Sequence, residues 1–216
     1  MKTTKKALLL TLCAVLLVAA SVLGTMAYLT STDEVQNTFT VGQVSIKLDE
    51  AKANTDGTLV EGADRVKANS YKLLPGHTYA KDPMVTVLNG SESSYIKMTV
   101  TFSKANELDA IFDPDGATLT TIFNGYDSSN WTYKGNTKNA ADDTRTYEFW
   151  YKEAVAAPDG NVALDALFDS ITVPGSITNE QLKTIEGMTI TVNAYAIQAD
   201  GFAKAEAAWA AFDAQK

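Results

Sequence analysis

Apolar and polar residues alternate in several short stretches of the chain, which is the pattern of half-buried β-strands. In the clearest stretch, residues 95–102, every second residue from Ile96 to Phe102 is apolar and is predicted to face the core, while Tyr95, Lys97 and two threonines face the other way. The same period predicts further strands over residues 39–48, 84–88, 119–123, 131–133, 147–151, 171–173 and 188–197.

Three segments carry helical features instead. Residues 104–112 have apolar side chains at helical spacing, and Thr178 with Gln181 has the spacing of a capping box at the start of a short helix. The alanine-rich stretch 203–214 predicts a helix at the end of the chain. The polar stretches 49–69 and 134–145 are predicted to be loops, the first a loop or a hairpin.

Many short strands separated by turn residues are typical of sandwiches and jelly rolls. We therefore predict a mostly β fold, a jelly-roll-like antiparallel sandwich with a few short inserted helices and a C-terminal helix. Residues 39–216 are long enough to form one such domain with a substantial core.

The first 27 residues have the layout of a secretory signal peptide. Lysines precede an uncharged run over residues 7–23, and the small residues Thr25 and Ala27 precede Tyr28. We expect cleavage between Ala27 and Tyr28, with cleavage after Ala20 as a second possibility. The alternative is an uncleaved membrane anchor, because the uncharged run is close to the shortest length that spans a bilayer.

Composition excludes several classes of site. The net charge of −8 and the lack of clustered lysines and arginines argue against binding to nucleic acid. The only cysteine, Cys13, lies within the apolar run, so the predicted mature chain has no disulfide, thiol nucleophile or cysteine metal site. A lipoprotein signal is a poor match, because the residue before Cys13 is the bulky Leu12.

No residue set in the sequence has the pattern of a catalytic, cofactor or metal site. There is no HExxH motif, and the single histidine, His77, follows Pro75-Gly76 in a predicted turn, where we expect it to be solvated. Paired carboxylates are numerous but are typical of acidic loops. The stretches 113–116 and 200–201 resemble calcium loops only in part. We therefore predict that the protein is not an enzyme and holds no cofactor.

The residues around the predicted cleavage site resemble the N-terminus of the TasA and camelysin family. Residues 24–30 read GTMAYLT and residues 37–42 read NTFTVG, close to the family pattern GTxAYxT followed by NxFTxGxxxI. Residues 74–83 and 190–201 are similar to two further stretches of that family. The resemblance implies a signal read by a signal peptidase of the SipW type. It also implies a secreted jelly-roll protein of the cell surface or biofilm matrix of a Gram-positive-type bacterium.

The resemblance further implies assembly into a fibre. In the better-known relatives, the N-terminal segment freed by cleavage inserts as an extra strand into the next subunit. Here that segment is residues 28–38, an exposed candidate donor strand in which Tyr28, Leu29 and Val35 are the apolar contacts. The expected partners are the signal peptidase, other copies of the chain, and matrix or host-surface components, with membrane contact only through the uncleaved signal. The alternative is a frayed terminus, or a segment that pairs within its own subunit.

Three functions are left open by the sequence. The first is the fibre subunit just described. The second is a monomeric surface adhesin that binds a ligand through aromatic residues such as Trp131 and Trp150. The third, a camelysin-like metalloprotease, lacks the residues that such an enzyme needs.

Overall fold

The computed structural model of the chain describes residues 6, 11–17, 42–112 and 119–214. Internal contacts divide the chain into two units, Met1–Val41 and Gly42–Lys216. In the first unit, residues 11–17 are helical and exposed. No helix among the described residues has the length and apolar character needed to cross a membrane. The predicted cleavage and donor residues lie outside the described residues: Thr25, Ala27, Tyr28, Leu29 and Val35.

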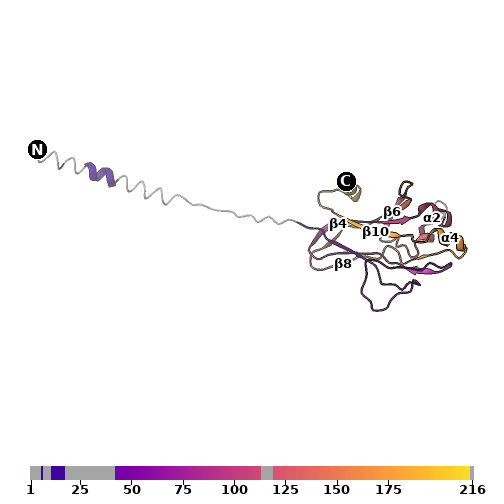
Figure 1. The fold of residues 1–216 in the computed structure, drawn as a ribbon. Coiled ribbons are helices and arrows are strands. Elements are labelled where there is room, and N and C mark those ends of the chain that lie inside the picture. Colours follow the sequence, from indigo (N-terminus) through magenta and orange to yellow (C-terminus); the bar gives the residue numbers. More distant parts are fainter. Residues whose placement is uncertain (1–5, 7–10, 18–41, 113–118, 215–216) are drawn as a thin grey trace. The chain divides into compact units, whose positions relative to one another are not determined.

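The second unit is mostly β, as predicted, and its strands are joined into antiparallel sheets (Figure 1). The largest sheet has the strand order β10-β4-β6-β5, with β7 paired to the start of β4. Its strands are β4 (Ser91–Ser103), β5 (Trp131–Asn139), β6 (Thr144–Tyr151), β7 (Val155–Ala157) and β10 (Ile190–Gln198). We call this sheet the main sheet.

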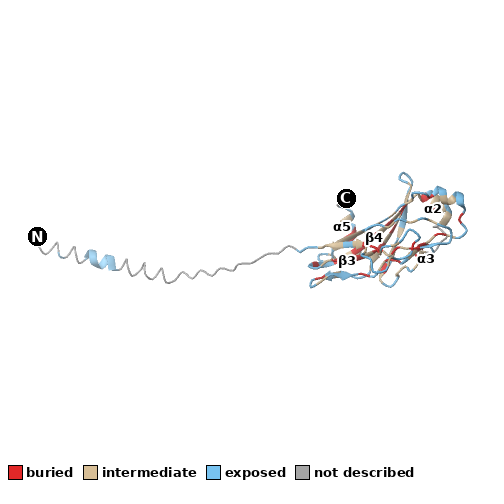
Figure 2. Cartoon of the chain, turned by 60° about the horizontal axis from the view of Figure 1, so that its bottom comes forward, coloured by how far each residue is buried: buried red, intermediate tan, exposed pale blue. Residues whose placement is uncertain are grey.

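A second layer of shorter strands faces the main sheet. It contains a three-stranded sheet of order β1-β3-β8 and a two-stranded sheet of β2 and β9. The strands are β1 (Ile46–Asp49), β2 (Thr78–Ala80), β3 (Met84–Val87), β8 (Val162–Ala163) and β9 (Ser170–Thr172). Figure 2 shows buried residues along β3 and β4, which belong to the two facing layers.

The predicted alternation of β4 is confirmed. Ile96, Met98, Val100 and Phe102 are buried, and the register aligns Met98 with Ala194 of β10 on one side and with Phe149 of β6 on the other. Side chains aligned in this way across neighbouring strands share one face of the sheet. The core face of the main sheet is therefore apolar across its two inner strands, β4 and β6, and its β10 edge.

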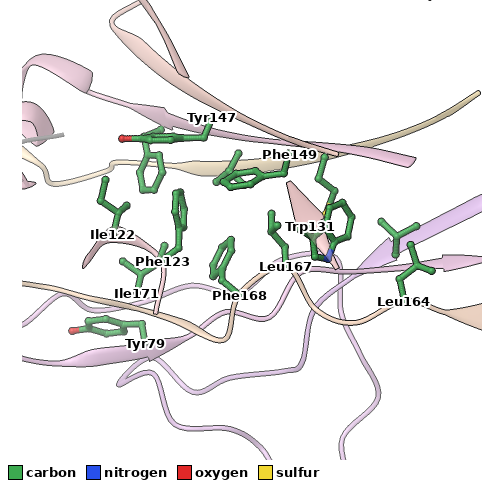
Figure 3. Packing of buried hydrophobic residues seen from close by; sticks show 14 of the residues in the cluster. Tyr79, Ile122, Phe123, Trp131, Tyr147, Phe149, Leu164, Leu167, Phe168 and Ile171 are labelled. Carbon is green, nitrogen blue, oxygen red and sulfur yellow. The ribbon is translucent and has the colours of Figure 1, made fainter. Parts of the chain in front are cut away.

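An aromatic cluster fills the space between the layers (Figure 3). Phe123 is its centre, with its ring centroid 4.8 Å from that of Phe168, 5.2 Å from that of Tyr147 and 5.7 Å from that of Phe149. Trp131 is also buried, and its indole N–H donates to the carbonyl of Asp165. Large buried aromatic side chains contribute most to a core of this size.

Four described helices accompany the sheets: α2 (Ala105–Phe112), α3 (Leu119–Ile122), α4 (Asn179–Thr184) and α5 (Ala205–Asp213). The predicted capping box is confirmed, because the Thr178 hydroxyl accepts from the Gln181 N–H and the Gln181 side chain accepts from the Thr178 N–H. Helix α5 lies on the outer face of the main sheet, where the ring of Trp209 contacts that of Trp150. The two rings are 6.1 Å apart, centroid to centroid.

Two predictions of secondary structure are wrong. Residues 119–123 form the short helix α3 and its end instead of a strand. One helical turn is enough to bring Ile122 and Phe123 into the core. A short apolar run does not distinguish a strand from a buried helical turn, so the sequence pattern was ambiguous here. Residues 134–145, predicted to be a loop, are mostly hairpin, with β5 reaching Asn139 and β6 beginning at Thr144. This part of the hairpin is largely exposed, so backbone pairing holds it without an apolar pattern.

Candidate functional site

Two strand edges face each other at one side of the domain without pairing. Within the described part of the chain, β1 pairs only with β3 and β10 pairs only with β4. Cα atoms of β1 and β10 nevertheless come within 8 Å of each other. We call the space between these two edges, with the loop residues that line it, the seam.

The hydrogen-bond pattern shows which backbone groups of β10 point into the seam. At the two ends of its pairing with β4, Ser103 N–H donates to the Thr189 carbonyl and Ala199 N–H donates to the Ser93 carbonyl. In an antiparallel ladder, hydrogen-bonded residues alternate with residues whose N–H and C=O groups point away. The outward groups of β10 are therefore those of Ile190, Val192, Ala194, Ala196 and Gln198, and they have no ladder partner among the described residues.

The same argument applies to β1. Leu88 N–H donates to the Ser45 carbonyl, so the odd-numbered residues of β1 bond to β3 and the backbone groups of Ile46 and Leu48 point into the seam. The Lys67 ammonium group donates to the Leu48 carbonyl and thus occupies one of these acceptors. Beyond β1, the seam is closed by Glu50, whose N–H and C=O both bond to Val66.

A cavity of about 330 Å³ lies at this end of the seam. Its walls come from both edges and from the loop after Val66, and they include Leu48, Glu50, Lys67, Lys81, Ile190 and Val192. The cavity is therefore partly apolar, from the two strands, and partly charged, from two lysines and two acidic residues, Asp49 and Glu50. Such a mixed surface suits an extended peptide that carries both apolar and polar side chains.

The charged wall of the cavity is a buried ion pair. Lys81 Nζ lies 2.6 Å from Glu50 Oε2, and the two residues are only 8% and 6% exposed. The other carboxylate oxygen, Oε1, accepts a hydrogen bond of 3.0 Å from the side-chain amide of Asn69. Buried charges are stable only when they are paired and hydrogen-bonded in this way.

A second ion network holds the loop 50–69 against the seam. The Arg65 guanidinium contacts Asp49 at 2.6 Å and Asp82 at 2.8 Å, and Lys47 also contacts Asp49 at 2.7 Å. Burial alone would raise the pKa of Asp49, but the hydrogen bonds from Lys47 and Arg65 outweigh it and hold this pKa below its usual value. The loop is therefore held by contacts that require ionised carboxylates.

Three described residues considered in the sequence analysis, His77, Trp131 and Trp150, do not lie at the seam. His77 is exposed in its turn, as predicted, with its ring centroid 6.4 Å from that of Tyr79. Trp131 is 1% exposed in the core, so it does not present a ligand-binding face. Trp150 lies on the opposite face of the sheet, and the Lys134 ammonium group lies 4.0 Å from its ring centroid. The two tryptophans therefore do not form the aromatic platform that the adhesin hypothesis requires.

The described residues contain no group of three or more histidine, cysteine, aspartate or glutamate side chains that could hold a metal ion. Residues 113–118, which include most of one calcium-like stretch, lie outside the described part. Residues 200–201 lie in a turn before α5. Compared with known proteins, the chain matches no family model, and no curated protein or solved structure is significantly similar to it.

Proposed function

We propose that the protein is a secreted structural protein of the bacterial cell surface or biofilm matrix, and that copies of it assemble head to tail by strand addition at the seam. The observation that carries the proposal is the pair of unpaired edges, β1 and β10, that face each other across the cavity. Exposed edges are templates for pairing with another chain. In this proposal the domain is a jelly-roll-like sandwich that is completed by a neighbour.

The proposed donor is the segment 28–38 of another copy, freed by cleavage after Ala27. It has 11 residues, against the 9 residues of β10, so it is long enough to pair along that whole edge. Successive side chains of a strand point to opposite faces, so one of its two acidic residues, Asp33 or Glu34, faces the cavity, where Lys67 carries the opposite charge. Because each copy gives its N-terminus to the next, the contact is heterologous and propagates an open filament.

The spacing of the seam limits how the added strand binds. Neighbouring strands in a sheet lie about 4.7–4.9 Å apart, so a strand paired to both edges needs about 9.5 Å between them. Here Cα atoms of β1 and β10 approach within 8 Å. The added strand therefore pairs with one edge, and β10 is the longer of the two, or the seam widens to take it between both.

Electron microscopy and sedimentation of two purified forms test the proposal. One form begins at Tyr28 and the other has extra residues ahead of it. We expect fibres from the first form only, because extra residues keep the donor segment from being freed. A third form that lacks residues 28–38 is expected to stay monomeric and folded. Fibres from that form would contradict strand donation, and monomers from all three forms would favour a monomeric surface protein.

A peptide provides the matched control. A synthetic peptide with the sequence of residues 28–38 is expected to bind the form that lacks this segment, with retarded exchange of the amide protons of β10. A peptide with the same residues in scrambled order has the same charge and composition but a different alternation, and it is expected to bind more weakly. Equal binding of both peptides would mean that charge alone drives the contact.

A further inference from the structure

Three side chains at the charged wall of the seam form a chain of contacts from an amine to an amide. Glu50 lies between the other two, since one of its carboxylate oxygens contacts Lys81 Nζ at 2.6 Å and the other accepts from Asn69 Nδ2 at 3.0 Å. Lys81 and Glu50 are both more than nine-tenths buried. The carboxylate therefore contacts a buried primary amine through one oxygen and a half-buried primary amide through the other.

The orientation of the Asn69 amide is fixed by its backbone partners. Its Oδ1 accepts from the Ala53 N–H at 2.9 Å, and its Nδ2 also donates to the Ala51 carbonyl at 2.8 Å. A backbone N–H can only donate and a backbone carbonyl can only accept, so the two ends of the amide cannot be exchanged. The amide nitrogen thus faces Glu50, and the amide oxygen faces a hydrogen-bond donor.

These contacts supply each part that an acyl-transfer reaction needs. Lys81 is the nucleophile, Glu50 touches both the nucleophile and the leaving nitrogen, and the Ala53 N–H lies where negative charge develops on Asn69 Oδ1. A carboxylate placed between two nitrogens can take a proton from one and give it to the other. A backbone N–H at the carbonyl oxygen stabilises the tetrahedral intermediate. Fixing the groups in one chain makes the reaction unimolecular.

We propose that Lys81 and Asn69 join in an intramolecular amide bond, with Glu50 as the proton carrier. Glu50 takes a proton from the Lys81 ammonium group, and the neutral Nζ attacks Cγ of Asn69. The bond between Cγ and Nδ2 then breaks as Glu50 gives its proton to Nδ2, which leaves as ammonia. Glu50 takes the remaining proton from the attacking nitrogen and passes it to the ammonia. The net change converts one ammonium group and one primary amide into a secondary amide and an ammonium ion, with no oxidant or cofactor.

The cross-link covalently joins two segments that line the cavity at the seam. It joins the loop after Val66 to the residue that follows β2, across 12 positions of the sequence from Asn69 to Lys81. The cavity at the seam is lined by all three reacting residues, and it provides a path for ammonia to leave. The cross-link is independent of strand donation, since both reacting residues belong to the same chain.

Mass spectrometry of the full chain tests the proposal. The denatured protein is expected to be lighter than its sequence mass by one ammonia molecule. Because an Asn-Gly pair such as Asn89-Gly90 also loses ammonia on forming a succinimide, the tryptic map decides the question. We expect residues 68–72 to be joined to a peptide of residues 73–97 that trypsin has not cleaved after Lys81. Free peptides 68–72 and 73–81 from the wild-type chain would overturn the proposal and leave a hydrogen-bond network only.

Substitutions separate the roles of the three residues. Lys81→Arg keeps the positive charge beside Glu50 but removes the nucleophile, and Asn69→Ala removes the acyl group, so both are expected to abolish the joined peptide. Glu50→Gln is expected to abolish it while leaving both reacting groups in place. Lys67→Arg, at the same cavity, is the matched control and is expected to retain the joined peptide. A joined peptide that persists in Glu50→Gln would overturn the role of Glu50, and the wild-type map remains decisive if a variant does not fold.

Discussion

The ammonium group of Lys97 lies 4.6 Å from the ring centroid of Trp209, beneath the C-terminal helix. Lys97 is 2% exposed although it points away from the core, because α5 covers it. The same ammonium group lies 5.2 Å from the centroid of the Phe212 ring and 3.6 Å from the Asp213 carboxylate, and both residues belong to α5. Desolvated cation–π contacts of this kind are worth about 2 kcal/mol. Helix α5 is therefore an integral part of the domain.

The first prediction concerns this contact. Trp209→Ala is expected to lower the free energy of unfolding by about 3–5 kcal/mol, the usual cost of removing a buried tryptophan side chain. The loss has two sources, because the substitution removes the packing of α5 against the sheet and leaves Lys97 facing an unfilled space. Denaturant unfolding followed by fluorescence of the remaining tryptophans measures it.

Ala210→Gln is the control for this substitution, because Ala210 is exposed on the same helix and glutamine is a good helix former. It is expected to change stability by about 0.5 kcal/mol or less. A similar loss in both variants would mean that α5 is unstable in itself and is not held by Trp209.

The sequence predicted most of the fold because the core strands alternate strictly. Ile96 to Phe102 of β4 and the long strand β10 carry this period over several residues, and each has one face on the core. The short strands β2 and β7 were missed, since three residues are too few to show a period. The outer part of the hairpin of β5 and β6 was missed for a different reason, because β5 has no buried residue after Trp131.

Sequence patterns alone could not predict the seam. Which edges stay unpaired depends on strand order, and β1 and β10 lie 140 or more positions apart in the sequence. The contact of Glu50 with Lys81 and Asn69 is likewise set by tertiary packing across 31 and 19 positions. The one signal in the sequence was the clustering of polar residues in 49–69, a stretch predicted to be only a loop or hairpin.

The second prediction compares two glycines of that stretch. Gly57 and Gly62 both have positive φ, +90° and +71°, which costs other residues about 1–2 kcal/mol. At Gly57 a Cβ would also lie 2.7 Å from the Thr78 carbonyl oxygen and 2.7 Å from Tyr79 Cα, whereas Gly62 has open space around it. Gly57→Ala is therefore expected to destabilise the protein clearly more than Gly62→Ala in thermal unfolding. Equal losses would mean that the backbone at Thr78 moves aside.

The third prediction tests the backbone directions at the edge of β10. The N–H of Ala194 points into the seam, while that of Asn193 bonds within the main sheet. Proline lacks this N–H and is tolerated in strands only where no ladder bond is lost. Ala194→Pro is therefore expected to keep the domain folded but to weaken binding of the 28–38 peptide.

Asn193→Pro is the matched variant on the neighbouring residue. It removes a ladder hydrogen bond and is expected to cost about 1 kcal/mol more than Ala194→Pro, the typical net value of such a bond. Circular dichroism melts of the two variants give the comparison. A greater loss in Ala194→Pro would place the ladder bonds of β10 on the even-numbered residues instead.

The fourth prediction concerns acid. Burial alone would raise the pKa of Asp109, but hydrogen bonds from Arg145 and Lys138 outweigh it and lower this pKa. A carboxyl group whose pKa is lower in the folded state stabilises the fold at pH values above 3.8, its pKa in the unfolded chain. This contribution is lost as the pH falls through the pKa of the folded state. Asp109→Asn is expected to cost about 2 kcal/mol at neutral pH and much less in strong acid. Denaturant unfolding at both pH values measures this, with the exposed Glu153→Gln as the control.

The last prediction concerns alkaline pH and Tyr71, beside the seam. Burial, with the nearby charge of Glu50, raises the pKa of Tyr71 to about 12, and its hydroxyl donates to the Ala80 carbonyl at 2.6 Å. The folded protein therefore holds this proton more tightly than the unfolded chain, whose tyrosines titrate near 10. Stability from Tyr71 is complete below pH 10 and is lost as the pH rises toward 12. Tyr71→Phe is expected to flatten that fall in the free energy of unfolding, and an unchanged alkaline slope would show that Tyr71 ionises as readily in the folded state as in the unfolded chain.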